Sequence, residues 1–253
     1  MVDSEQVLGI PEVDRTLWTA LPMGWLALLS GTTGSGAPLL AKQFAHAGVG
    51  TVPVLFYTTY ERTEDVKKAF ADFGWDPAGV QIVNLADEYY ERVLVRGLEV
   101  ARARETGLSL DQIVADRPQR TDLATFSLTN RMLSDLAGID SPFRLVIDSL
   151  DFFFEALAPH EVTTVARQIR HRCQTIGGQA LMAIHSSHDD RASYGLHDLA
   201  DITFKLAAEP NGSQYEHTLF LDKVANHPDL THVWHAVTGE NGWRVEDRAP
   251  GRG

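Results

Sequence analysis

The sequence predicts an α/β protein, with a mainly parallel central sheet, helices on both faces and antiparallel strands at the C-terminal edge. Short apolar runs alternate with longer amphipathic segments through most of the chain, which is typical of a parallel sheet covered on both faces. From residue 201 onward, strand-like runs follow one another directly, which predicts antiparallel strands added to one edge. The 253 residues are 44% hydrophobic and contain no repeat or linker, so we expect one domain over 1–253.

The first half of the chain predicts three strands and two helices. WLALLS reads as a buried strand, and VPVLFYTTY is rich in β-branched and aromatic residues. TEDVKKAFADFG places its apolar residues on one helical face, between a capping Thr63 and a capping Gly74. We therefore expect strands at 25–30, 52–60 and 80–85, and helices at 38–47 and 63–74.

The second half begins with a mostly helical stretch at 86–140, in which a break is expected at Pro118. We interpret residues 86–125 as an elaboration of the domain. The remaining pattern predicts strands at 143–150 and 179–187, a helix at 160–175, and C-terminal strands with turns at Asn211-Gly212 and Asn241-Gly242.

Composition and charge disfavour several classes of protein. The net charge of −12 argues against sequence-blind binding of nucleic acid, which requires lysine and arginine to displace counterions, although it leaves a local basic patch open. No stretch approaches the roughly 20 apolar residues of a membrane helix, and the acidic N-terminus lacks the features of a signal peptide. The single cysteine, Cys173, cannot form an internal disulfide, so we expect a cytoplasmic protein with no membrane partner.

A glycine-rich stretch between the first strand and its helix has the spacing of a phosphate-binding loop. Backbone N–H groups at such a helix N-terminus form an anion site, and in the full motif G-x-x-x-x-G is followed by Lys and by Ser or Thr. Here Ala37 and Pro38 hold those two positions, and the alternative is a tight turn that packs a helix on a sheet. The residues of this candidate nucleotide site are Gly31, Thr32, Thr33, Gly34, Ser35, Gly36, Ala37 and Pro38.

Two acidic residues follow strands that we expect to lie beside the loop. Asp148 ends the apolar strand RLVIDSL, where a P-loop protein places the carboxylate that holds the Mg²⁺ water shell. Glu61, in TTYERT, has the position of a base that orients an attacking water. The alternatives are a strand-end aspartate that caps a turn and a solvated carboxylate at a helix N-terminus.

These segments, in this order, resemble the KaiC-like branch of the RecA-type ATPases. The opening LGIPEVDRTLWTALPMGWLALLSGTTGSG is similar to that family's first segment, strand and Walker A loop. ADFGWD at 71–76 and HDLAD at 197–201 are the most specific matches, and residues 86–125 match least. The similarity covers most of the chain and implies a RecA-like P-loop fold.

The resemblance also implies roles for single residues. Glu61 corresponds to the first acid of the family's pair, the base, while Arg62 replaces the second acid. Asp148 corresponds to the Walker B acid, and Ala37 and Pro38 replace the Walker A lysine and hydroxyl.

The family's late K-L-R segment, which reaches a neighbouring subunit's nucleotide, is also altered. Lys223 corresponds to its lysine, whereas Ala225 stands in place of its arginine. Several independent losses together indicate a catalytically inactive pseudo-ATPase that acts as a regulatory or signal-transduction partner. These losses leave open residual binding of ATP or another nucleotide and argue against binding of Mg²⁺. A regulatory role implies protein partners, with an active paralogue and self-association as options.

Two other functions stay open from the sequence. One is an active ATPase in which another basic residue replaces the missing lysine; Lys42 lies too far along its helix for this, and Arg62 has the reach. The other is a DNA-recombination accessory protein, which the net charge disfavours.

Four further groups of residues are candidates for a functional role or for a purely structural one. HSSHDD at 185–190 offers metal ligands without a zinc spacing, and in the family this loop lies near the nucleotide, where it could sense a ligand or partner. DFFF at 151–154 is either core or a docking patch. Cys173 lies in a helical pattern that predicts burial, and we expect the C-terminal histidines at the surface or at an interface: His227, His232 and His235.

Overall fold

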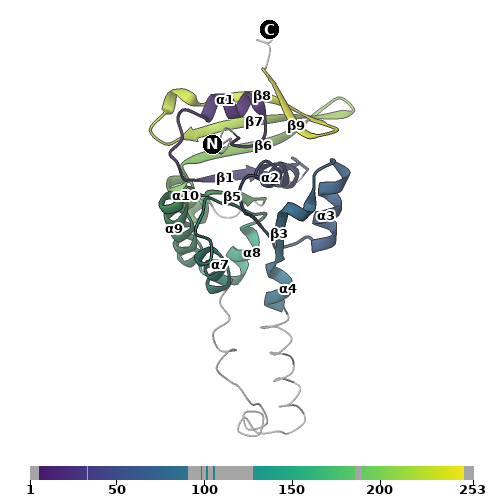
Figure 1. Cartoon of the computed structure of the whole chain (residues 1–253). Helices are drawn as coiled ribbons and strands as arrows, with labels where there is room; N and C mark the ends of the chain where they lie inside the picture. The colour runs from purple at the N-terminus through teal and green to yellow at the C-terminus, as the bar shows by residue number, and fades with distance from the viewer. Residues whose placement is uncertain are drawn as a thin grey trace.

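A single nine-stranded sheet runs through the molecule in the order β3-β2-β4-β5-β1-β6-β7-β8-β9 (Figure 1). The computed structural model describes residues 6–32, 34–90, 128–185 and 190–247, and positions 98, 101 and 105. The strands are β1 Trp25–Gly31, β2 Val54–Thr58, β3 Val80–Asn84, β4 Arg144–Ile147, β5 Gln179–Ile184, β6 Ile202–Asn211, β7 Gln214–Val224, β8 His232–Gly239 and β9 Gly242–Asp247. Strands β1 to β6 pair in parallel and β6 to β9 antiparallel, so the predicted fold class is confirmed.

Helices cover both faces of the parallel part because its strands are apolar on both sides. Ala27 and Leu29 of β1 belong to the core cluster that contains residues of α1, α2 and α3, whereas Leu26 and Leu28 belong to the cluster on the other face, with residues of α7, α8, α9 and α10. The helices are α1 Pro11–Leu17, α2 Ala37–His46, α3 Thr63–Asp72, α4 Leu85–Tyr89, α7 Leu128–Ala137, α8 Asp151–Ala156, α9 Pro159–Ile176 and α10 Asp190–Leu199, with short 3₁₀ helices at Pro77–Gly79 and Pro228–Leu230.

Three strands end earlier than the sequence predicts. β2 stops at Thr58 instead of residue 60, β4 at Ile147 instead of residue 150, and β5 at Ile184 instead of residue 187. β2 ends there because the N–H of Thr59 donates to the side chain of Asp148, far away in the sequence, at 3.0 Å instead of to a neighbouring strand. These early ends leave three loops side by side at the carboxyl edge of the sheet.

The first helix after β2 is capped differently from the prediction. Arg62 is its N-cap, without a side-chain cap, and Thr63 is its first residue. Gly74 lies one residue beyond the C-cap and takes the left-handed φ of 70° that ends the helix. The break expected at Pro118 and most of the 86–125 elaboration lie outside the described residues.

The two segments that matched the family most specifically have structural roles. Asp201 of HDLAD accepts from the Leu26 N–H at 3.0 Å and from the guanidinium of Arg170, with its nearest N–O distance 2.6 Å, so it ties β1 to α9. Trp75 of ADFGWD stacks on Phe73 and on His46 of α2. Both segments hold helices to the sheet at a distance from the loops.

The structure also describes the single thiol and the lengths of the helices. Cys173 is buried in α9, and burial raises the pKa of its thiol to about 12, so the thiol stays protonated at neutral pH. Within the described part of the chain, every helix is too short or too polar to cross a bilayer.

Candidate functional site

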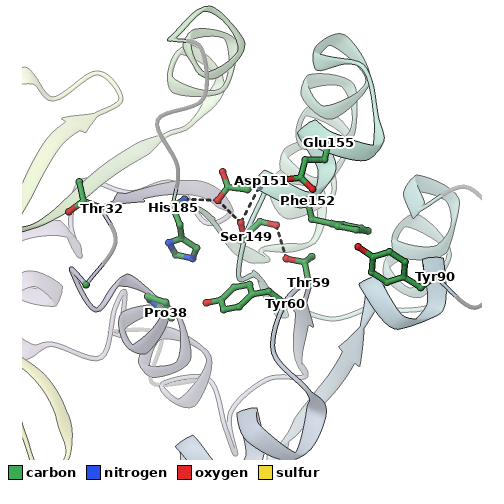
Figure 2. A pocket seen from close by; sticks show the side chains of 11 residues that line it. Thr32, Pro38, Thr59, Tyr60, Tyr90, Ser149, Asp151, Phe152, Glu155 and His185 are labelled. Carbon is green, nitrogen blue, oxygen red and sulfur yellow. Dashed lines mark hydrogen bonds between the residues drawn. The ribbon is translucent and has the colours of Figure 1, made fainter. Parts of the chain in front are cut away.

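The loops after β1, β2, β4 and β5 meet around a cavity of about 460 Å³ at the carboxyl edge of the sheet (Figure 2). Ligands bind at this edge in open α/β sheets because consecutive strands deliver their loops there. The described residues that line the cavity are Thr32, Gly34, Pro38, Thr59, Tyr60, Tyr90, Ser149, Asp151, Phe152, Glu155 and His185. The structure thus brings the glycine-rich loop close to the segments that contain Glu61 and Asp148.

The glycine-rich loop uses its own N–H groups internally. The Ser35 N–H donates to the Thr32 carbonyl at 2.9 Å, and the Ala37 N–H is directed at Ser35 Oγ at 3.4 Å. Pro38 has no N–H to offer. An added Cβ on Gly31 would lie 2.6 Å from both Ser35 Oγ and Ala37 Cβ, so the turn is closed tightly around these two side chains. Thr33 lies outside the described residues.

Side chains of the C-terminal strands contact the glycine-rich loop. Nε1–H of Trp243, in β9, donates to the Gly36 carbonyl at 3.2 Å. An added Cβ on Gly36 would lie 2.4 Å from the Trp243 ring, and Gly36 has a left-handed φ of 81°. The His217 ring lies 3.4 Å from the Gly34 carbonyl and edge-on to Trp243. The loop is therefore fixed by direct contacts with the terminal strands.

Glu61, which the sequence predicts as the base, forms an ion pair. Nζ of Lys42, on α2, lies 2.7 Å from Oε1 of Glu61, and the Lys42 side chain is only 4% exposed. Lys42 also lies 5.9 Å from the Phe56 ring centroid and acts electrostatically on Asp148 and on His185. The ammonium thus lies among the acidic residues that the sequence singled out.

Asp148 is fully buried and bonded on one oxygen. Its Oδ1 accepts from the Thr59 N–H at 3.0 Å and from Thr59 Oγ1 at 3.1 Å, while Oδ2 has no partner among the described residues. Burial raises the pKa of this carboxyl to about 7, against the hydrogen bonds and Lys42, which lower it. A carboxyl whose protonated form is favoured in this way is a weaker metal ligand, because a metal binds the ionised form.

His185 closes the cavity on the β5 side. Its backbone N–H donates to Asp151 Oδ2 at 2.9 Å, and Ser149 Oγ donates to Asp151 at 2.8 Å (Figure 2). Its ring Nε2 lies 2.6 Å from the Asp148 carbonyl. Burial lowers the pKa of the His185 imidazole, so the ring is neutral at pH 7.

The metal reading of 185–190 rests largely on residues 186–189, which lie outside the described part of the chain, as does the side chain of Asp190. Among the side chains that the structure describes, no three metal-ligating residues gather.

Lys223 is engaged within its own chain. Its ammonium donates to the carbonyls of His197 and Asp198 at 2.7 and 3.0 Å, at the C-terminal turn of α10. A cation at a helix C-terminus is favourable because the last carbonyls lack intrahelical partners.

A family model described as the KaiC ATPase matches residues 7–245. The chain belongs to the KaiC family of ATPase domains. A segment of 65 residues is 43% identical to the circadian clock oscillator protein KaiC 1 of Synechocystis sp., over 25% of this chain and 12% of that protein. A UPF0273 protein of Pyrobaculum aerophilum is 37% identical over 71 residues, 27% of this chain and 25% of that protein. These alignments therefore cover a quarter or less of either relative.

Solved structures support the fold over nearly the whole length. The crystal structure of a KaiC-like protein from the hyperthermophilic archaeon Pyrococcus horikoshii superposes with a TM-score of 0.64, covering 96% of this chain and 98% of that chain. The sequence identity is 19%, so this likeness concerns the fold alone.

Lys42 has a role at this site that the sequence does not predict. Its place on the helix predicts that it cannot replace the missing lysine, and in the structure its ammonium pairs with Glu61 and acts electrostatically on Asp148. Helical side chains lean toward the N-terminus, so a lysine in the second turn reaches back over the first. The signal available in the sequence was a lysine on an otherwise apolar helix, since Leu40, Ala41 and Phe44 surround it.

Proposed function

We propose that this chain is a KaiC-like pseudo-ATPase that does not hydrolyse ATP and acts as a regulatory or signal-transduction partner of other proteins. The observation that carries the proposal is the Lys42–Glu61 ion pair. A carboxylate that is already bonded to a buried ammonium at 2.7 Å is a poor base, because proton transfer to it would break the pair.

The closed loop supports the same proposal. Two of its N–H groups are directed within the loop, and Ala37 and Pro38 supply neither the ammonium nor the hydroxyl of the full motif. Charge clamps on a transferring phosphoryl group contribute several kcal/mol each, and an arginine finger alone about 10³–10⁵ in rate. Residual nucleotide binding would have to rest on the remaining backbone groups.

The residues present do not fit a catalytic Mg²⁺. Asp148 is buried and its pKa is raised by that burial, Glu61 is paired with Lys42, and Pro38 has no hydroxyl. A hard divalent cation requires several oxygen ligands, usually with carboxylates among them. We therefore assign no step to a metal in this chain.

The proposed role requires a protein partner. An active member of the same family is the partner that the shared fold favours, and self-association is a further option. We place this activity in the cytoplasm, on the basis of a single, buried, unpaired cysteine.

The isolated protein is expected to release no phosphate from ATP above background, with or without Mg²⁺. Ala37, Pro38 and Ala225 replace the lysine, the hydroxyl and the arginine that stabilise the transferring phosphate in the family. A coupled phosphate-release assay measures this. The Glu61→Gln variant separates a contaminant from true activity: steady hydrolysis that disappears in this variant would contradict the proposal.

ATP is expected not to drive assembly of a ring. A ligand shifts an equilibrium only by its differential affinity, and this loop offers nucleotide few contacts, with Ala225 in place of the family's arginine. Size-exclusion chromatography with light scattering, with and without Mg²⁺-ATP, is expected to give one unchanged mass. A nucleotide-dependent increase to a hexamer would show that the site still bridges subunits.

A further inference from the structure

The cavity beside the loop has a lining unlike that of a phosphate site. Its described lining residues include two carboxylates, Asp151 and Glu155, and no lysine or arginine. Lys42, whose ammonium acts electrostatically on the lining residue His185, is already paired with Glu61. A site for phosphate requires positive charge or free N–H groups directed at the ligand, so this lining favours a ligand of the opposite charge.

The two carboxylates come from one face of α8. Asp151 and Glu155 are four residues apart and therefore neighbours on the helix surface, and Figure 2 shows both beside the cavity. Asp151 is held in place by Ser149 Oγ and the His185 N–H.

Aromatic rings form the other walls. Tyr60, Tyr90 and Phe152 line the cavity and come from three different elements. The Tyr90 and Phe152 ring centroids are 6.3 Å apart, and Tyr60 lies edge-on to His185 at 5.9 Å. Aromatic faces attract cations within about 6 Å, and recognition of quaternary ammonium groups uses such walls together with nearby carboxylates.

Building on the proposed function, in which nucleotide binding is at most residual, we propose that the cavity binds an organic cation, a guanidinium or alkylammonium group held by Glu155 and Asp151 against Tyr60, Tyr90 and Phe152. The volume of about 460 Å³ lies within the range of small-molecule sites. A divalent metal fits less well, because the described side chains include no cluster of three ligands.

Isothermal titration of the full chain with matched probes tests the charge requirement. Choline and its uncharged carbon analogue 3,3-dimethylbutan-1-ol have the same shape, and choline is expected to bind at least about ten-fold more tightly. Two further probes then separate two sources of a guanidinium group. Agmatine represents a free small molecule, and acetyl-arginine amide represents an arginine side chain of a protein. Equal binding of choline and its neutral analogue, or no binding of any of the four probes, overturns the proposal.

Variants locate the binding in this cavity. Glu155→Gln and Tyr90→Leu change exposed side chains, and each is expected to weaken choline binding at least about five-fold. Glu209→Gln removes the same charge from the exposed β6–β7 hairpin and is expected to change nothing. Thermal melts check that each variant is folded, and unchanged binding in both cavity variants overturns the assignment. Glu61-dependent ATP hydrolysis would contradict the proposed function, while the choline comparison still decides the cation site.

Discussion

Replacing Glu61 by glutamine is expected to lower the thermal midpoint of the protein by roughly 6–12 °C, since about 3 kcal/mol is lost and each kcal/mol shifts Tm by about 2–4 °C at this chain length. The variant leaves the Lys42 ammonium, 4% exposed, without its carboxylate. We take the lower end of the range for broken buried pairs because the Glu61 side chain is 22% exposed and water reaches it. Differential scanning calorimetry or fluorimetry measures the shift.

Two comparisons make this result specific. Glu64→Gln, in the exposed first turn of α3, removes the same charge and is expected to change stability by less than about 0.5 kcal/mol. The double variant Lys42→Met/Glu61→Leu replaces the pair by apolar side chains and is expected to recover most of the loss. A Glu61→Gln protein that melts together with the wild type would mean that the ion pair contributes nothing, and the proposed function would lose its main support.

Replacing Asp148 by asparagine is expected to change how stability depends on pH. The carboxyl has a pKa of about 7 in the folded protein and about 3.8 in the unfolded chain, so between these values only the folded state holds the proton. Stability from this group is therefore complete below about pH 4 and is lost as the pH rises to about 7. Relative to wild type, the variant should gain on the order of 3 kcal/mol in stability between pH 5 and pH 8, because each pKa unit corresponds to about 1.4 kcal/mol.

Thermal melts of both proteins at pH 5, 6, 7 and 8 measure this difference, and Asp14, whose pKa burial also raises to about 6, cancels in the comparison. Asp140→Asn changes an exposed carboxylate and is expected to leave the pH profile unchanged. Parallel pH profiles for wild type and Asp148→Asn would show that Asp148 is ionised in the folded protein, as a metal-binding aspartate would be.

Periodicity predicted the fold well because burial dictates it. Strands such as β1 are apolar on both faces, and this pattern arises only where helices cover both sides of a parallel sheet. The strand ends were harder to predict because tertiary hydrogen bonds decide them. β2 ends at Thr58 because the next N–H bonds to Asp148, which lies far away in the sequence.

The sequence predicts where the candidate site lies on the sheet, but not which side chains contact one another inside it. The glycine spacing and the strand-end acids placed the loop, Glu61 and Asp148 at one edge of the sheet, since parallel strands deliver their carboxyl ends there. The roles of Lys42 and Trp243 follow from contacts across the fold, Lys42 with Glu61 and Trp243 with Gly36. No local pattern encodes these distances.

The buried ammonium of Lys42 also has a consequence for what this protein can report about the cell. In an ATPase, the charge at the centre of the site changes with each nucleotide that arrives, is cleaved and leaves, so its conformation follows the ratio of ATP to ADP. Here a buried ammonium of the chain itself lies 2.7 Å from the acid at this position. Under the proposed function, nucleotide turnover does not alter this pair, and any signal that the protein transmits enters through a different ligand or partner.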